Sequence, residues 1–317
     1  MQNGKNLKYN RNYTADFVNL LVSLSLFVAA VCLAFFFSPM ISEDVKAGLL
    51  LCYTAIIPSV FPFMILADLM LSYMHFENFK ALRYLFSRLF KINGYAISAF
   101  VAGIICGFPI GAKMAKELYV AGKITKNECE RLIGFSNNAS PAFVISGVGY
   151  GLLGSLKTGV FLYTVSVISS VIVGISAGLF QKLPKDTLVK TDLPFSFTKS
   201  IKSASQGTLT VCGFITFFSI VIGFLGRLIK SRELLVILSS FLEIGNATRL
   251  IAQTHVFSNE LSLSLFAFTI GFSGLSVHFQ SRSLIGDTDI SMKKYYIMKL
   301  LTGALSSIIT ALFFLFT

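Results

Sequence analysis

The sequence predicts an all-α, polytopic integral membrane protein with two inverted repeats that contain broken or re-entrant helices. Of its 317 residues, 54% are hydrophobic and only 13% are charged, whereas a soluble domain carries roughly 25% charged residues. The hydrophobic residues form a series of long apolar segments, and several of these are interrupted by polar residues, glycine or proline. Composition and interruption together indicate helices that are not all simple membrane spans.

The apolar segments follow one another at 17–37, 46–74, 94–108, 132–153, 156–180, 205–228, 234–254, 260–280 and 295–316. The first one follows Lys5, Lys8 and Arg11. It is longer than the apolar core of a signal peptide and ends at Ser38-Pro39 instead of a small-residue cleavage site. We therefore expect a retained first transmembrane helix.

Four of these segments are interrupted by residues that do not suit a continuous span. Two interruptions lie in each half of the chain, at 107–109, 136–141, 243–249 and 271–278. Because lipid cannot satisfy open backbone groups, each break must face protein or a water-filled cavity. The breaks are the main functional signal of the sequence.

Polar stretches separate the apolar segments. Residues 75–93 predict an amphipathic surface helix, and Thr125 and Glu128 have the spacing of a capping box that opens a helix. A lysine-rich stretch divides the chain into halves. The predicted organisation is a first transmembrane helix (1–45), repeat 1 (46–180), a basic linker (181–204) and repeat 2 (205–317).

The two halves resemble each other in their order of features. Residues 97–132 parallel 261–300, since both contain an apolar stretch, a glycine-marked break and a basic amphipathic helix. The positive-inside rule places the N-terminus inside, so the second repeat starts on the opposite side from the first. This topology places the basic residues Arg227, Lys230 and Arg232 outside, which conflicts with the positive-inside rule. Inverted repeats with broken helices are typical of secondary transporters, whose sites lie near the midplane.

The first break supplies the candidates Gly107, Pro109, Gly111 and Lys113. Close helix packing alone would explain the glycines. Pro109, so near a helix start, indicates in addition free backbone N–H groups that face an anion, assisted by the helix dipole and by Lys113.

The second break supplies Ser136, Asn137, Asn138 and Ser140, followed by a proline suited to the first turn of a new helix. One interpretation is an extramembrane loop between two interfacial helices. The other is a hairpin tip whose amide and hydroxyl groups bind a polar substrate.

The third break contains Glu243, Asn246, Thr248 and Arg249. Ionisable residues at the centre of an apolar segment mark a functional site by default. Arg249 is a candidate carboxylate clamp because its planar guanidinium binds carboxylates bidentately. The alternatives are an ion pair with Glu243 or a side chain that extends to the membrane interface.

The fourth break contains Ser276 and His278 and is followed by Gln280. The repeat relates His278 and Gln280 to Gly111 and Lys113. A lone histidine is more often a hydrogen-bonded structural residue than a ligand. On the functional interpretation, these residues complete the expected substrate site.

Other classes of function lack a matching pattern. The net charge of +12 lies in short clusters between apolar runs, as expected for residues that face anionic lipid headgroups. It forms no continuous stripe of the kind that binds nucleic acid. The sequence has no HExxH or C-x-x-C pattern, and Gly271-Phe272-Ser273-Gly274 is not G-x-S-x-G, so neither an enzyme nor a metal or cofactor site is predicted.

At these same stretches the chain resembles a known family. Its motifs at 57–63, 107–113, 130–141, 242–244 and 274–280 are similar to those of the sporulation integral membrane protein YlbJ family, also called SpoVV, of the nucleoside-recognition Gate superfamily. The resemblance covers roughly 45–316. It implies transport of dipicolinic acid into the developing spore. Dipicolinate is a small planar dianion, which suits Arg249, Lys113, His278 and exposed helix N-termini.

We therefore expect a multi-pass protein of the bacterial cell membrane or the outer forespore membrane. It would carry a small organic anion by alternating access, with that anion and the lipid bilayer as its partners, and the oligomeric state is left open. The alternatives are a Gate-family carrier of a nucleoside or another carboxylate, and a non-transporting scaffold. If Arg249 is the clamp, Arg249→Ala abolishes substrate accumulation.

Overall fold

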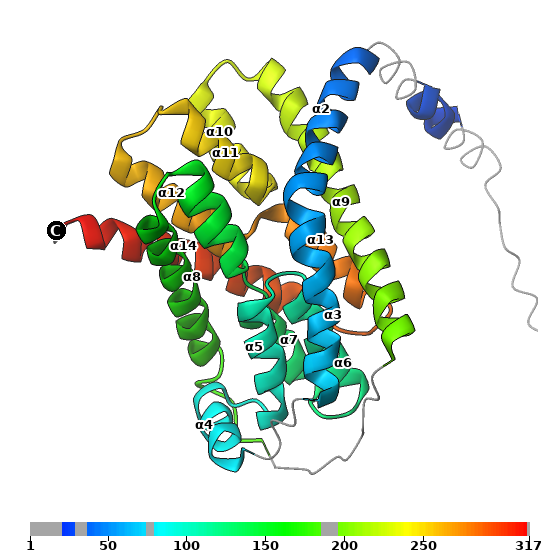
Figure 1. Ribbon diagram of the computed structural model, residues 1–317, viewed down its shortest axis with the longest axis vertical. Coiled ribbons are helices and arrows are strands. Elements are labelled where there is room, and N and C mark those ends of the chain that lie inside the picture. The colour runs from blue at the N-terminus through cyan, green and yellow to red at the C-terminus, as the bar shows by residue number, and fades with distance from the viewer. Residues whose placement is uncertain (1–20, 29–36, 74–78, 185–195, 316–317) are drawn as a thin grey trace, which may run out of the picture.

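The computed structural model describes residues 21–28, 37–73, 79–184 and 196–315, and every regular element in these ranges is helical. This confirms the predicted all-α class. The elements are α2 (Ser38–Leu51), η1 (Cys52–Ile56), α3 (Ile57–Tyr73), α4 (Lys80–Phe90), η3 (Gly94–Ala96), α5 (Ile97–Ile105), α6 (Ile110–Val120), α7 (Lys126–Ser136), η4 (Ala142–Leu152), α8 (Leu156–Ser176), α9 (Phe197–Leu228), α10 (Arg232–Leu242), α11 (Ile244–Thr254), α12 (Asn259–Phe272), α13 (Gly274–Ile285) and α14 (Lys293–Leu315) (Figure 1).

Several helices are long and apolar enough to cross a membrane. Within the described residues they are Leu156–Ser176, Phe197–Leu228, Asn259–Ile285 and Lys293–Leu315. A fifth candidate is the pair Lys80–Phe90 and Gly94–Ile105, which is bent by 98°. The predicted first helix, 17–37, lies largely outside the described residues, although 21–28 are helical.

The first half of the chain crosses the molecule, folds a hairpin into it and then crosses it twice more (Figure 1). The run α2–η1–α3 leads from the top of the view to the bottom, where α4 lies. Helices α5 and α6 pack against each other as a hairpin, with Gly103 of α5 lying against Gly111 of α6. The interrupted helix α7–η4 then rises and α8 descends beside it.

The second half repeats this order in the opposite direction. Helix α9 packs antiparallel to α2–α3, since Gly48 lies against Ser219 and Gly207 lies against Met64. Helices α10 and α11 form a hairpin that enters from the top of the view. The interrupted helix α12–α13 follows, and α14 then runs across the view to the C-terminus at its left edge. Phe313, near the end of α14, contacts Phe161 near the start of α8.

This arrangement corrects the internal alignment expected from the sequence. The hairpin α5–α6 corresponds to the hairpin α10–α11, and not to 261–285, which forms the interrupted helix α12–α13. In the same way, the polar stretch 136–140 interrupts a crossing helix and is not a hairpin tip. The sequence aligned the wrong pair because both kinds of break carry glycine and polar residues, and only packing distinguishes a hairpin from an interrupted span.

The breaks lie where the local backbone demands them. Gly107 has φ +82°, and Ser273 and Gly274 have φ +75° and +78°, which lie in the left-handed region where a helix cannot continue. The predicted capping box is confirmed. The hydroxyl of Thr125 accepts the backbone N–H of Glu128, and the carboxylate of Glu128 accepts the backbone N–H of Thr125. The predicted surface helix is α4, which buries Arg83, among others, on one face.

Charge distinguishes the two ends of the helical bundle. Basic residues gather at the end that contains α4 and the α6–α7 turn: Lys80, Arg88, Lys91, Lys116, Lys123, Lys126, Arg282, Lys293 and Lys294. At the opposite end, Arg227 donates two hydrogen bonds to Asp44, at 2.7 and 3.1 Å. Arg227 is therefore offset by a carboxylate, which removes part of the conflict with the positive-inside rule. We assign the basic end to the cytoplasm.

Replacing Gly103 with alanine tests the close packing of the α5–α6 hairpin. A Cβ atom at this position would meet the carbonyl of Ser136, a backbone group that cannot move away freely. We expect Gly103→Ala to destabilise the protein by about 1–3 kcal/mol. The control is Gly213→Ala on α9, whose Cβ would have nothing within 4 Å. Thermal unfolding in detergent measures both, and equal midpoints would contradict the packing.

Cysteine labelling tests which end faces the cytoplasm. Lys230 and Lys293 are exposed and lie at opposite ends of the bundle. In intact cells, a membrane-impermeant maleimide should label Lys230→Cys and should label Lys293→Cys only after permeabilisation. The reverse pattern would invert the orientation.

Candidate functional site

The four helix breaks converge on one buried cavity. Its wall contains Phe108 from the first break, Ser140 from the second and Glu243 from the third. Gln280, on α13 just after the fourth break, completes the wall. Side chains of α2–η1–α3 and α9 close the remaining side, namely Leu51, Ile56, Val60, Val211 and Ile215. The cavity measures about 40 Å³, room for a few water molecules and far less than the roughly 300 Å³ or more of a small-molecule pocket. A ligand would require the surrounding helices to separate.

The breaks contact one another in pairs. A Cβ atom on Gly107 would lie 2.7 Å from the backbone nitrogen of Ser140, so the hairpin α5–α6 fits directly against the interruption of α7–η4. In the second half, a Cβ atom on Gly274 would lie 3.2 Å from the Cα atom of Glu243. Gly107 and Gly111 therefore have a packing role, since Gly111 also lies against Ser136 and Asn137. Pro109 forms the N-cap of α6 without lining the cavity.

Glu243 lies at the tip of the α10–α11 hairpin and caps α11. Its carboxylate accepts the backbone N–H groups of Gly245 at 2.9 Å and Asn246 at 2.6 Å, and the amide of Asn246 at 2.9 Å. Asn246 also donates to Ser219 of α9 at 3.0 Å. The N-terminus of α11 thus already binds an anion, the side chain of Glu243. It is not an open site for a substrate carboxylate, contrary to the expectation from sequence.

Gln280 presents an open hydrogen-bonding group beside the cavity. Its amide donates to Ser276 at 3.1 Å. Its carbonyl oxygen Oε1 is buried without a hydrogen-bond partner. An unpaired buried polar atom costs free energy unless something binds it, so Gln280 is suited to a ligand that carries a donor group.

A polar cluster continues from the cavity into the protein interior. Asn137 donates to Ser281 at 2.8 Å and to the hydroxyl of Tyr295 at 3.3 Å. The same hydroxyl lies 3.0 Å from Nδ1 of His278. Nε2 of His278 and Oδ1 of Asn137 are buried without partners. The cluster therefore joins the second and fourth breaks, and His278 is held within it as a hydrogen-bonded residue.

Lys299 of α14 places a cation in this cluster. Its side chain is fully buried, and its ammonium donates to the backbone carbonyl of Asn137 at 3.1 Å. That carbonyl lies at the C-terminal end of α7, where the helix dipole favours a cation. Among the described residues, no carboxylate lies within 4 Å of the ammonium. Lys299 is thus a buried amine without an acidic partner among the described residues.

Two predicted cations have other roles. Lys113 is buried on α6, but its ammonium lies 2.5 Å from Asp68 and 3.9 Å from Glu117, so its charge is already compensated. Arg249 is exposed on α11 and does not line the cavity. The prediction that Arg249 clamps a substrate at the breaks is therefore wrong for this conformation, because α11 turns its side chain to the outside.

The remaining predicted residues are buried near the breaks without forming part of the cavity wall. Asn138 donates to the carbonyl of Phe135 at 2.7 Å, and Thr248 donates to that of Ile244 at 2.8 Å. Both therefore satisfy backbone groups of their own helices. Ser136 is fully buried and its hydroxyl lacks a partner.

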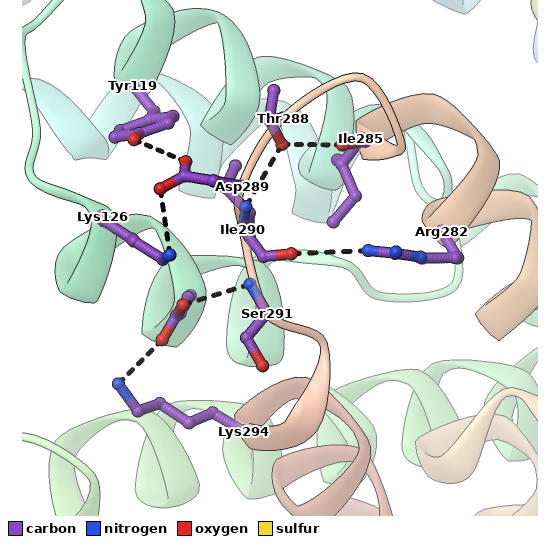
Figure 2. Close-up of polar contacts among 10 residues, drawn as sticks. Tyr119, Lys126, Arg282, Ile285, Thr288, Asp289, Ile290, Ser291 and Lys294 are labelled. Atoms are coloured by element: carbon purple, nitrogen blue, oxygen red, sulfur yellow. Dashed lines mark hydrogen bonds and ion pairs between the residues drawn. The ribbon is translucent and has the colours of Figure 1, made fainter. Parts of the chain in front are cut away.

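Below the cluster, the turn between α13 and α14 binds the first half of the chain (Figure 2). Asp289 accepts from Tyr119 at 2.8 Å and from Lys126 at 2.9 Å, and Lys126 and Tyr119 together lower the pKa of its carboxyl. Glu130 accepts the backbone N–H of Ser291 at 3.1 Å and the ammonium of Lys294 at 2.9 Å. These pairs connect the two halves at the basic end; Lys126 and Asp289 are exposed and their pair is weak, whereas Glu130 is buried.

Sequence reasoning missed Lys299, Tyr295 and Ser281. A signal for Lys299 was available, since it is an ionisable residue within the apolar segment 295–316. It lies near the start of that segment, where a lysine looks like an ordinary flanking residue. Tyr295 and Ser281 carry no comparable signal. In the described part of the chain, no group of three His, Cys, Asp or Glu side chains is placed to hold a metal ion.

The apolar spans, the interrupted helices and the buried polar interior define a multi-pass integral membrane protein. The chain is 26% identical to "Sporulation integral membrane protein YlbJ" of Bacillus subtilis (strain 168), over 92% of this chain and 82% of that protein. This similarity, which covers nearly the whole chain, supports membership of the YlbJ family. No family model matches the chain, and no solved structure matches it.

Replacing Glu243 tests its role as the cap of α11. Glu243→Ala removes the acceptors of two backbone N–H groups and should lower stability by about 1–2 kcal/mol. Glu243→Gln keeps one oxygen acceptor and should lose less. The control is Glu260→Ala in the exposed first turn of α12, and thermal unfolding compares the three. A midpoint for Glu243→Ala equal to that of the control would rule out the capping role.

Proposed function

We propose that this protein transports a small organic anion across the membrane by alternating access, with dipicolinate as the first candidate substrate. One observation carries the proposal. Two halves that run in opposite directions each contribute a hairpin tip and a helix interruption to the same buried cavity. Inverted repeats around a midplane site are the architecture in which one half can move against the other and expose the site to either side.

The charge of the interior favours an anionic substrate. Lys299 is a buried amine whose hydrogen-bond acceptor is a neutral carbonyl, so it can carry a positive charge when an anion lies beside it. Asn137 and His278, beside it, have further buried polar atoms without partners. Burial of an uncompensated charge is costly, and an anion that enters the cluster would offset that cost. Glu243 does not oppose this arrangement, because its carboxyl group is already engaged by the first backbone N–H groups of α11.

The size of the cavity requires movement. At about 40 Å³ it cannot hold an aromatic dicarboxylate. The contacts at the basic end between the 286–292 turn and α6–α7 include the ion pairs Lys116–Asp287 and Lys126–Asp289, whose carboxylates are exposed. Such pairs break and reform at little cost. Opening at this end would separate the halves and widen the cavity toward the cytoplasm.

Dipicolinate is proposed from the resemblance to the sporulation family, together with the buried cation. A planar dianion can accept hydrogen bonds from an ammonium and an amide at once. The first alternative is a Gate-family carrier of a nucleoside or another carboxylate. The second alternative is a scaffold that transports nothing. On the proposed function, the protein acts in the membrane that surrounds the developing spore.

Uptake into proteoliposomes tests the proposal. Vesicles that contain the protein should accumulate labelled dipicolinate in preference to uridine and citrate. Lys299→Met should reduce apparent affinity about 10–100-fold, because a charge-assisted hydrogen bond is lost. Arg249→Ala, which removes an exposed cation, should leave uptake unchanged. Preferred uptake of uridine would favour the nucleoside alternative, and no uptake of any of the three would favour the scaffold.

A further inference from the structure

Two adjoining hollows lie at the basic end of the bundle, apart from the helix breaks. A chamber of about 550 Å³ lies beside the α6–α7 turn, and a groove of about 670 Å³ runs between α8 and α14. Asn127, Arg131 and Gln181 line both hollows, so the chamber and the groove adjoin each other.

The chamber carries excess positive charge. Its basic lining residues are Lys91, Lys123, Arg131 and Lys182, and its acidic lining residue is Glu128. The carboxylate of Glu128 is already occupied, because it accepts backbone N–H groups of Asn93 and Thr125, each at 2.7 Å. Arg131 donates to the backbone carbonyls of Phe90 and Lys91, whereas Lys91 and Lys182 have no carboxylate within 4 Å among the described residues. The chamber therefore attracts an anionic group.

The groove is apolar over most of its length. Its walls come from α8, with Ile172 and Val173, and from α14, with Ile297, Leu301 and Ile308. Between Lys294 and Ile308 the helix rises by about 21 Å at 1.5 Å per residue. One leaflet contributes about 15 Å of hydrocarbon, so the groove is long enough for an acyl chain.

Neutral polar groups lie where the chamber and the groove meet. Asn127 donates to Gln181 at 3.1 Å and accepts from Lys294 at 2.6 Å. Lys294 in turn pairs with Glu130. This layer of amide groups between a basic and an apolar region matches the order of phosphate, ester and acyl chain in a phospholipid.

We propose that the chamber and the groove together bind one anionic phospholipid, with its phosphate in the chamber and an acyl chain between α8 and α14. Basic pockets between transmembrane helices on the cytoplasmic side recognise such headgroups. Phe180, 96% exposed, and Leu183 also line the chamber. Apolar side chains at the rim suit a membrane lipid and not a free phosphate compound, for which they would contribute nothing.

The proposal is tested on the full chain, purified in a neutral detergent. Phosphatidylglycerol, phosphatidylcholine with the same acyl chains, and soluble glycerol 3-phosphate are added separately. Native mass spectrometry counts bound lipid, and thermal unfolding gives the stabilisation. We expect phosphatidylglycerol to be retained and to raise the unfolding midpoint, and the other two compounds to have little effect.

Variants locate the site. The triple variant Lys91→Gln, Lys123→Gln, Lys182→Gln should bind phosphatidylglycerol about 100-fold more weakly, since each lysine near an anionic headgroup is worth about five-fold. Ala304→Phe should block the groove, whose lining includes Ala304. The control removes equal charge from exposed positions at the opposite end, as Lys46→Gln, Lys157→Gln, Lys230→Gln, and should bind normally.

Three outcomes would overturn the proposal. Equal retention of phosphatidylcholine would show that the site does not select charge. An equal effect of glycerol 3-phosphate would make it a site for soluble phosphate compounds. Equal loss of binding in the triple and control variants would reduce the effect to net charge. Because native mass spectrometry reads binding directly, a folded variant that elutes as a single species in size-exclusion chromatography suffices for each comparison.

Discussion

A helix that ends inside a bilayer needs partners for its terminal backbone groups, because lipid offers none. In this protein, side chains of neighbouring elements supply them. Glu243 accepts the first N–H groups of α11, Ser140 accepts the N–H of Phe143, and Lys299 donates to the carbonyl of Asn137. Since each end depends on a side chain or a closely packed backbone nearby, the four breaks must lie together. The buried cavity is the consequence of this requirement.

The antiparallel relation of the two halves follows from the same packing. Small residues allow α9 to lie directly against α2–α3, and Asp44 pairs with Arg227 at their common end. With α8 and α14 also running in opposite directions, one hairpin enters from each side. Cations then gather at the basic end, where they bind the 286–292 turn and line the chamber beside the α6–α7 turn.

Much of the candidate site could be predicted from polarity alone. Asn137, Glu243, Ser276, His278 and Gln280 were predicted as polar residues at interruptions of apolar segments, and all five are buried there. Arg249 was chosen by the same argument and is exposed, because α11 restarts at Ile244 and its rotation turns residue 249 outward. Lys299 was not predicted, because a lysine near the start of an apolar segment resembles an ordinary flanking charge. Only the packing of α14 shows that it is buried.

The sequence by itself determined the membrane class, the positions of the four breaks and the capping box at Thr125, because apolar length, helix-breaking residues and cap spacing are local properties of the chain. The tertiary structure decided which breaks are hairpin tips and which interrupt a crossing helix. It also decided that Lys113 pairs with Asp68 and that Lys299 donates to the carbonyl of Asn137. These facts depend on how each helix is rotated about its axis and on neighbours 45 and 162 residues away, which no local pattern records.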